Sequence, residues 1–146
     1  AVLHVGLAGG RGVEPGRLVV GTEAVYCDLE AHWPVVDRAS ADAGLRRRAG
    51  AALTDAVSMP IHTSAAVGAA AASAPDGPLV EAMEGFGVLR AAARAGVPAV
   101  EVRAISNAIG EADRARWDLD GALTALAAAL PGLVAAVAEP SRARGS

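Results

Sequence analysis

The chain has 146 residues, of which 53% are hydrophobic, and its formal net charge is −3 at pH 7. This length corresponds to one globular domain, and the interspersed acidic and basic residues argue against a nucleic-acid-binding surface, which requires clustered positive charge. All thirteen basic residues are arginine. The chain therefore has no lysine that could form a Schiff base or bind phosphate as in a Walker motif.

Cysteine and histidine are too few and too scattered to predict a metal site. The single cysteine, Cys27, cannot form a disulfide framework. His4, His32 and His62 lack the spacing of zinc ligands, and we expect neither a metal nor a cofactor. No signal peptide is visible, and no apolar run free of charge and proline approaches the ~20 residues that cross a membrane. We therefore expect a cytoplasmic protein with no membrane partner.

The first third of the chain predicts strands separated by glycine turns, followed by a polar helical region. Residues 1–7 alternate loosely, as a buried strand does, and this strand is expected to stop at the small residues 8–10. Residues 17–27 predict a strand pair or one bent strand, with Gly21 as a bulge. Residues 39–56 are polar and arginine-rich, which predicts a surface helix broken at its two internal glycines.

A further strand, followed by a helix, is predicted in the middle of the chain. Residues 57–63 predict a short strand, and the alanine-rich residues after it predict a helix with Ser64 as its N-cap. His32 and Trp33 are expected in a loop of variable length.

Residues 79–95 predict a helix that carries a carboxylate on its apolar side. Six apolar or small residues recur there at helical spacing, namely Val80, Met83, Gly87, Val88, Ala91 and Ala95. Glu84 lies on this stripe, whereas Glu81 lies on the solvated side. A buried carboxylate costs several kcal/mol unless it is paired or hydrogen-bonded, so Glu84 needs a partner. An ordinary ion pair, or a residue out of phase with the stripe, would also account for it.

Residues 99–106 predict a buried strand that ends at Asn107. Asn107 is the only asparagine of the chain, which contains no glutamine. An asparagine at the end of a strand is usually a turn residue, so the residue alone decides nothing. Glu101 and Arg103 lie two apart on one face of this strand and are expected to form an internal ion pair.

The last part of the chain predicts one long helix. Asp118 is the expected cap of an amphipathic helix, which should continue past Pro131 because residues 133–138 remain apolar. We expect the domain to comprise residues 1–138 and a disordered tail to comprise residues 139–146. The alternation of strands and helices predicts an α/β fold with a mostly parallel sheet, whose ligand would bind at the carboxyl ends of the strands.

The motif V-E-x-M-E-G, followed about twenty residues later by V-R-A-I-S-N, resembles the purine nucleoside phosphorylase and nucleosidase superfamily. This resemblance implies a three-layer α/β/α fold around a mixed, mostly parallel sheet. The chain begins within an apparent core strand, so we expect it to lack the first strands of that fold. The resemblance also implies a homo-oligomer that binds a small purine nucleoside.

The resemblance assigns roles to individual residues of this chain. Met83 and Glu84 would hold the ribose, and Asn107, which follows Ser106, would be the catalytic residue that addresses the purine. The first glycine turn, G-x-A-G-G, would approach the nucleoside closely through Ala8 and Gly9, although an ordinary glycine turn would look the same. By register, His62 and Thr63 would face the purine, and a partly buried structural role for His62 is the alternative.

The identity of the residue at position 107 bears on the substrate. The segment NAIGEADRARWDLDGAL resembles the futalosine hydrolases, whereas most nucleosidases for methylthioadenosine or adenosylhomocysteine have Asp at this place. An amide has two N–H donors, which can serve both N7 and O6 of a 6-oxopurine. We therefore predict hydrolysis of the N-ribosidic bond of futalosine, which releases hypoxanthine in menaquinone biosynthesis.

Two other functions remain open at this point. One is another purine nucleosidase or a phosphorylase of the same superfamily. The other is an inactive nucleoside-binding module, because the N-terminal third of the superfamily fold, with its water-activating Glu, would be absent from this chain.

Overall fold

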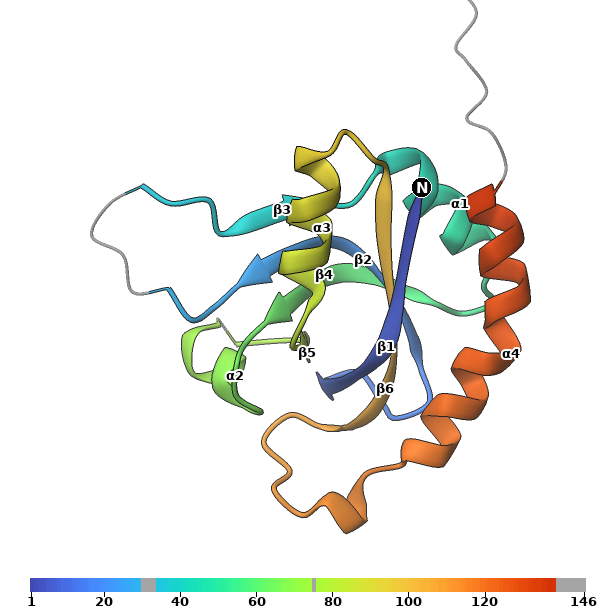
Figure 1. Cartoon of the computed structure of the whole chain (residues 1–146). Coiled ribbons are helices and arrows are strands. Elements are labelled where there is room, and N and C mark those ends of the chain that lie inside the picture. The colour runs from blue at the N-terminus through green and yellow to red at the C-terminus, as the bar shows by residue number, and fades with distance from the viewer. Residues whose placement is uncertain (30–33, 75, 139–146) are drawn as a thin grey trace, which may run out of the picture.

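The computed structural model describes residues 1–29, 34–74 and 76–138 (Figure 1). The loop expected at His32 and Trp33 and the tail expected at residues 139–146 lie outside the described residues. The strands are β1 Val2–Arg11, β2 Leu18–Tyr26, β3 Arg38–Ser40, β4 Val57–Thr63, β5 Leu79–Ala82 and β6 Ala99–Ala108. The helices are α1 Ala43–Ala51, α2 Ala69–Ser73, α3 Gly85–Arg94, the 3₁₀ turn η1 Arg114–Arg116 and α4 Leu119–Ala138.

The strands form a mixed sheet that closes on itself. The strand order is β3-β2-β4-β5-β1-β6, and β2 also pairs with β6. The pairs β1–β6, β2–β4 and β4–β5 are parallel, whereas β1–β5, β2–β3 and β2–β6 are antiparallel. The prediction of an α/β fold with a mixed sheet is confirmed. The β2–β6 pairing gives backbone partners to β6, which an open sheet of this order would leave at its edge.

Helices cover the sheet on both sides. α1 and α4 pack against each other and against β1, β2 and β6, whereas α3 packs against β2, β3, β4 and β6 (Figure 1). The core under α1 and α4 contains Leu45, Val102 and Leu133, all nearly or fully buried. The core under α3 contains Leu89 and Ala92. These two cores fix the directions of β1 and β6, which carry most of the site described below.

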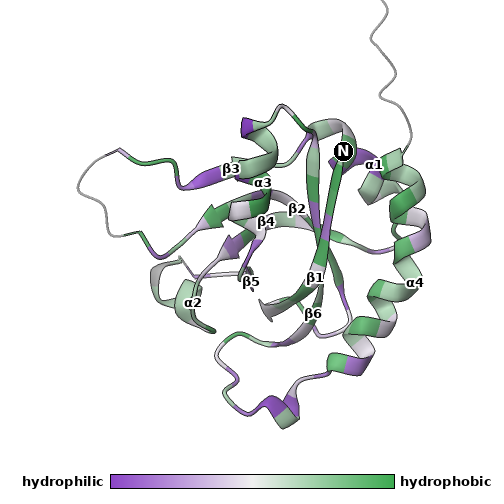
Figure 2. Ribbon diagram, in the orientation of Figure 1, coloured by the Kyte–Doolittle hydropathy of each residue, from purple (hydrophilic) through white to green (hydrophobic). Residues whose placement is uncertain are grey.

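The long last helix matches its prediction. Asp118 Oδ1 accepts a hydrogen bond from Gly121 N at 3.0 Å, and the helix continues through Pro131 to Ala138. It is long and apolar enough to cross a membrane by length and composition alone, with a mean hydropathy of 1.9. Green colours most of its length in Figure 2. Its inner side, which includes Leu126, packs against β1 and β6.

The helix predicted over residues 79–95 is wrong in its first part. Residues 79–82 form strand β5, all four of whose side chains are buried, and α3 begins only at Gly85. Glu81, predicted to be solvated, is 6% exposed and lies between Gly9 of β1 and His62 of β4. Apolar residues three apart fit a helix, but a four-residue buried strand satisfies the same short pattern.

Two other predicted boundaries also differ. β1 does not stop at residue 7 but continues to Arg11, with a register shift between Ala8 and Gly9. The helix predicted after residue 63 begins only at Ala69, and Ser64 does not cap it, because its hydroxyl donates to Glu81. In both places a side-chain or cross-strand contact outweighs the local sequence preference.

Three further predictions concern the first half of the chain. The bent strand at residues 18–26 is confirmed, with an irregularity between Gly21 and Ala24, and the strand at residues 57–63 is confirmed as β4. The polar region 39–56 contains the short edge strand β3 and only one helix, α1, which includes both glycines. Asp42 caps α1 by accepting a hydrogen bond from Leu45 N at 2.8 Å.

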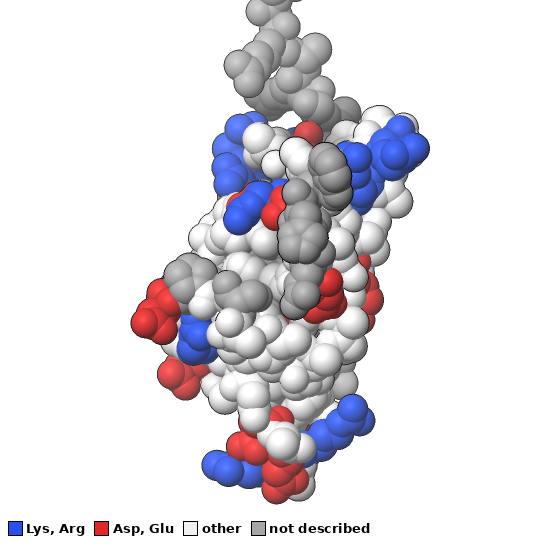
Figure 3. Space-filling view, turned by 90° about the vertical axis from the view of Figure 1, so that its left-hand side faces the viewer, with Lys and Arg blue, Asp and Glu red and all other residues white. Residues whose placement is uncertain are grey.

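Charged residues of both signs are distributed over the surface. On the face in Figure 3, arginine and acidic side chains lie near one another toward the two ends, and the middle of the face is largely uncharged. Arg38 and Glu23 form one such surface pair at 2.7 Å.

Candidate active site

A pocket lies where the ends of β1, β5 and β6 meet. Its cavity volume is about 190 Å³, and twelve residues line it. Six of these are residues expected at the site, namely Ala8, Gly9, Met83, Glu84, Ser106 and Asn107. The other six were not expected there: Leu7, Val67, Glu81, Ala82, Trp117 and Leu119. The structure therefore brings together residues from five separate parts of the chain, namely 7–9, 67, 81–84, 106–107 and 117–119.

Asn107 enters the pocket from the end of β6, where the β1–β6 register shifts. Ala8 pairs with Ile105 and Gly9 pairs with Asn107, so Ser106 is the extra residue of the bulge. A Cβ on Gly9 would lie 3.2 Å from Asn107 Nδ2. Glycine at this position therefore leaves room for the amide.

The amide of Asn107 is held on both of its sides. Its Oδ1 accepts a hydrogen bond from Ser106 Oγ at 2.8 Å, and its Nδ2 donates to the carbonyl of Ala108 at 2.9 Å. An amide nitrogen carries two N–H groups. With one of them directed to Ala108, the second remains for a molecule in the pocket.

Glu84 sits at the N-cap position of α3, and its carboxylate is 58% exposed rather than buried. The prediction that it lies on a buried helix face is therefore wrong, although it does have a partner. Its Oε2 accepts a hydrogen bond from Arg103 Nη2 at 2.9 Å. The contact directs the carboxylate to the edge of the pocket, which Met83 also lines.

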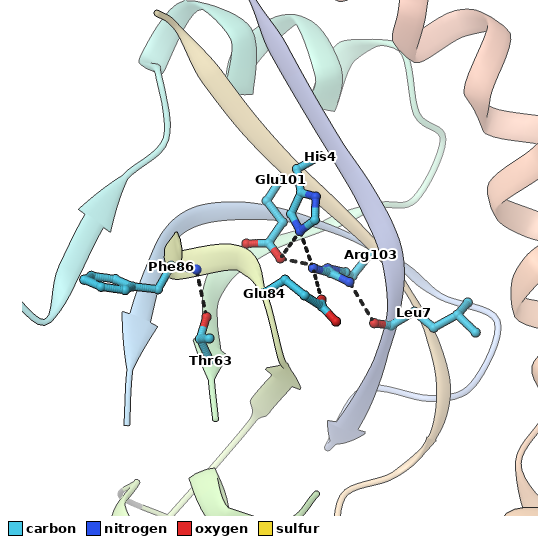
Figure 4. Close-up of polar contacts among 7 residues, drawn as sticks. All are labelled: His4, Leu7, Thr63, Glu84, Phe86, Glu101 and Arg103. Atoms are coloured by element: carbon cyan, nitrogen blue, oxygen red, sulfur yellow. Dashed lines mark hydrogen bonds and ion pairs between the residues drawn. The ribbon is translucent and has the colours of Figure 1, made fainter. Parts of the chain in front are cut away.

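Arg103 is the centre of the polar cluster that supports Glu84 (Figure 4). Its Nε donates to Glu101 Oε1 at 2.7 Å, which confirms the predicted internal ion pair. Its Nη1 donates to the carbonyl of Leu7 at 3.2 Å, and its Nη2 lies 2.5 Å from His4 Nε2. The sequence did not reveal the link to Glu84, because that contact depends on how α3 starts above β6.

Glu101 explains why α3 begins with a glycine. The Glu101 side chain is fully buried, and its Oε2 has no hydrogen-bond partner among the described residues. The carboxylate lies where a Cβ on Gly85 would be, so a larger residue there would displace it. Burial raises the pKa of Glu101, and the neighbouring Arg103 opposes that rise.

His4 is held in its neutral form by this cluster. Burial and the Arg103 guanidinium, in that order, lower the pKa of His4. Neutral imidazole has one nitrogen that accepts a hydrogen bond, so Nε2 can accept from Arg103. Protonation would replace this bond by a contact between two cations.

The lowered pKa of His4 predicts a loss of stability in mild acid. The unfolded chain takes up a proton near pH 6.5 more readily than the folded chain does, so the free energy of unfolding falls as the pH drops from about 7. The lowered pKa of His62 acts in the same direction. The raised pKa of Glu101 acts in the opposite direction, because its folded form binds the proton more readily above pH 4.5.

We expect His4→Gln, whose amide oxygen can still accept from Arg103, to weaken this pH dependence. Urea unfolding at pH 7.5 and pH 5.5 would measure it, with the wild-type protein losing more stability between the two pH values than the variant. Equal losses in both proteins would show that His4 is not the titrating group.

His62 and Thr63, both expected to face the purine, are not among the residues that line the pocket. Thr63 is buried at the end of β4, and its Oγ1 accepts a hydrogen bond from Phe86 N at 2.9 Å. Burial and Arg38 lower the pKa of His62. Thr63 thus fixes the start of α3, and the structural alternative for His62 agrees with its position on β4.

Trp117 and Leu119 border the pocket from the segment between β6 and α4. Trp117 Nε1 donates to the carbonyl of Glu111 at 3.0 Å, and the Arg114 guanidinium lies 5.6 Å from the ring centre. The sequence motif included Trp117 but did not indicate that it reaches the pocket. These contacts hold the indole at the pocket edge.

Comparison with known proteins identifies the family of this chain. The profile described as "Phosphorylase superfamily" matches residues 1–139. The chain belongs to the phosphorylase superfamily. It is 38% identical to futalosine hydrolase of Streptomyces coelicolor over 147 aligned residues, which cover 86% of this chain and 61% of that protein. It is 52% identical to futalosine hydrolase of Acidothermus cellulolyticus over 60 residues, or 41% of this chain and 25% of that protein.

Solved structures of two nucleoside hydrolases share the fold. A 5′-methylthioadenosine/S-adenosylhomocysteine nucleosidase from S. pneumoniae, bound to a transition-state inhibitor, matches with a TM-score of 0.78 and 20% identity. The match covers 94% of this chain and 70% of that one. Futalosine hydrolase of Helicobacter pylori matches with a TM-score of 0.76 and 17% identity, over 92% of this chain and 67% of that one. The expected nucleoside phosphorylase-like fold is confirmed.

Proposed function

We propose that this chain forms the ribose- and base-binding part of a futalosine hydrolase, which releases hypoxanthine from futalosine. The observation that carries the proposal is the pairing of a carboxylate, Glu84, with a side-chain amide, Asn107, at one pocket. The 38% identity to the Streptomyces coelicolor futalosine hydrolase supports it. The chain spans 61% of that relative's length, so the proposal concerns the activity of the whole protein.

In this proposal Glu84 binds the sugar. Its carboxylate accepts hydrogen bonds from the vicinal 2′ and 3′ hydroxyls of the ribose, and such charge-assisted bonds are among the stronger ones. Arg103 holds the carboxylate in place from beneath. Cleavage of an N-ribosidic bond builds positive charge on the ribose, and an anion next to the ring stabilises that charge. Met83, half-exposed at the same edge, packs against the sugar.

Asn107 assists the departure of the base. Negative charge develops on the purine as the bond breaks, and a donor to N7 stabilises it. The N–H of Asn107 that does not contact Ala108 is available for this bond, while Ser106 keeps the amide oxygen turned away from N7. The amide thus presents a donor without needing a protonated acid. Ala8 and Gly9 form the small-residue wall beside it.

The remaining features of the proposal concern the whole protein. The cavity of about 190 Å³ is smaller than the ~300–1,000 Å³ of typical ligand sites, so the nucleoside must extend beyond the residues that line it here. We place the acid that activates the attacking water outside these lining residues. We also propose that the protein works in the cytoplasm, as a homo-oligomer, in menaquinone biosynthesis.

The test is to incubate the full-length protein with futalosine, inosine and methylthioadenosine, with and without phosphate, and to quantify the free base. We expect hypoxanthine from futalosine at a rate independent of phosphate. Release only in the presence of phosphate would instead identify a phosphorylase. Binding of hypoxanthine without release of base from any substrate would identify an inactive nucleoside-binding module.

A further inference from the structure

One buried charge at the pocket has no part in the proposed chemistry. Glu81 lines the pocket wall from β5 and is 6% exposed. All described hydrogen bonds of its carboxylate lead to residues 64–70, which run from the end of β4 into the start of α2. Its Oε1 accepts from Ser64 Oγ at 2.9 Å and from Ala70 N at 2.7 Å, and its Oε2 accepts from Gly68 N at 2.6 Å.

The segment 64–70 contributes one residue, Val67, to the wall of the pocket. Val67 lines the cavity and is 50% exposed. Gly68 has a positive φ of 86°, and a Cβ there would lie 3.5 Å from Gly110 Cα. The segment therefore lies against the turn that follows β6, so its position affects the shape of the cavity at Val67.

Other groups also hold the start of this segment, because Ser64 N donates to the carbonyl of Ala82 at 3.1 Å and Ala65 N donates to Asp28 Oδ2 at 2.5 Å. Glu81 holds its later part, through Gly68 N and Ala70 N. Helix α2 has five residues, and its N-cap, Gly68, provides no side-chain hydrogen bond. Helices this short are not stable on their own in water. The Glu81 carboxylate supplies the acceptor that the cap lacks, and bonds of backbone N–H groups to an ionised carboxylate are stronger than neutral ones.

We propose that Glu81 is a positioning residue of the nucleoside pocket. Its carboxylate holds residues 64–70 in place, so that Val67 forms the wall against which the bound purine nucleoside packs. The identity of the ligand rests on the proposed function, whereas the hydrogen bonds from Glu81 to the segment do not. Glu81 acts through this segment rather than on the reacting atoms, so its loss should weaken binding more than it slows the chemical step.

Glu81→Gln tests the proposal with little change of shape. A glutamine has one acceptor oxygen, so its amide group must face either Gly68 N or the donors Ser64 Oγ and Ala70 N. Ser64→Ala is the matched control, because it removes the hydroxyl that bonds Glu81 and the carbonyl of Ala66 but keeps both backbone bonds to the carboxylate. Val67→Ala removes the wall contact and leaves the Glu81 hydrogen bonds intact.

Binding and catalysis would be measured separately. Trp117 borders the pocket, so its fluorescence reports the binding of hypoxanthine once Trp33 and any other tryptophan of the full-length protein are replaced by phenylalanine. We expect Glu81→Gln to raise both the Kd for hypoxanthine and the KM for futalosine about tenfold, with kcat changed less than about threefold. Ser64→Ala should change each constant by less than about threefold. Val67→Ala should raise the Kd without affecting the order of the segment.

Hydrogen–deuterium exchange of residues 64–70 provides a readout that needs no ligand. We expect exchange to be at least about tenfold faster in Glu81→Gln and unchanged in Val67→Ala. Unchanged exchange in Glu81→Gln would overturn the proposal whatever the substrate is. If Glu81→Gln speeds exchange but leaves the Kd for hypoxanthine and the KM for futalosine unchanged, Glu81 stabilises the segment without positioning the pocket, and the proposal fails. If the wild-type protein releases no base from futalosine but exchange responds as expected, the proposed function fails and the positioning role stands.

Discussion

Replacing Glu84 by glutamine is expected to lower kcat/KM for futalosine by about 10³-fold, which corresponds to about 4 kcal/mol of transition-state stabilisation. The amide oxygen can still accept the hydrogen bond from Arg103, so the side chain should keep its place. The variant loses the negative charge that faces the developing positive charge on the ribose. It also loses one of the two acceptors for the sugar hydroxyls.

Steady-state kinetics with futalosine would check this result, and Glu23→Gln is the matched control. Glu23 also pairs with an arginine, Arg38, at 2.7 Å, but this pair lies on the surface between β2 and β3. Exposed pairs of this kind contribute about 0–1 kcal/mol, so the control should retain wild-type activity. If Glu84→Gln stays within threefold of the wild-type protein, the carboxylate does not act on the sugar.

The fold was predictable wherever a long stretch of sequence carried one consistent pattern. β6 and α4 were located from runs of ten and twenty residues, and Asp118 was identified as a cap from its type and position. The strand β5 was missed because it has four residues and leads directly into α3. Closure of the sheet through β2 and β6 was also missed, because pairing between distant strands leaves no local pattern.

The residues of the candidate site also differ in whether the sequence could predict their roles. Met83, Glu84 and Asn107 belong to short motifs, so a resemblance could assign them, and they do line one pocket. Arg103 and Glu81 owe their roles to neighbours that are distant in the sequence. Arg103 reaches Glu84 because β6 lies beneath the start of α3, and Glu81 reaches residues 64–70 because β5 pairs with β4. Such contacts between distant residues cannot be predicted from local sequence patterns or from composition.

Replacing Asn107 by aspartate should change which base the enzyme releases. The Asn107 Nδ2 lies 2.9 Å from the carbonyl of Ala108, where an ionised carboxylate oxygen would be repelled. The variant is therefore driven to hold a proton at this position, and a protonated Asp has a single donor to share between Ala108 and N7 of the purine. Its other oxygen takes the place of Oδ1, which accepts from Ser106 Oγ, and it cannot donate. Asparagine can exchange its bond to Ala108 for one to the O6 of hypoxanthine, whereas the variant has no second donor for O6 and its acceptor suits a 6-amino group.

We expect the ratio of kcat/KM for futalosine to that for methylthioadenosine to fall at least about 100-fold in Asn107→Asp, because a site built for hydrogen bonding rejects a mismatched partner strongly. Ser106→Ala is the control, since it removes the bond to Oδ1 but leaves the amide donors and the bond to Ala108 that also orients the amide. It should lower both rates and keep the ratio. The pH profile of Asn107→Asp should gain a loss of activity on the alkaline side, where the aspartate gives up the proton that it donates to the base. An unchanged ratio would mean that a residue other than Asn107 distinguishes the two purines, and the preference for the 6-oxo base would then have to come from the part of the protein that completes the pocket.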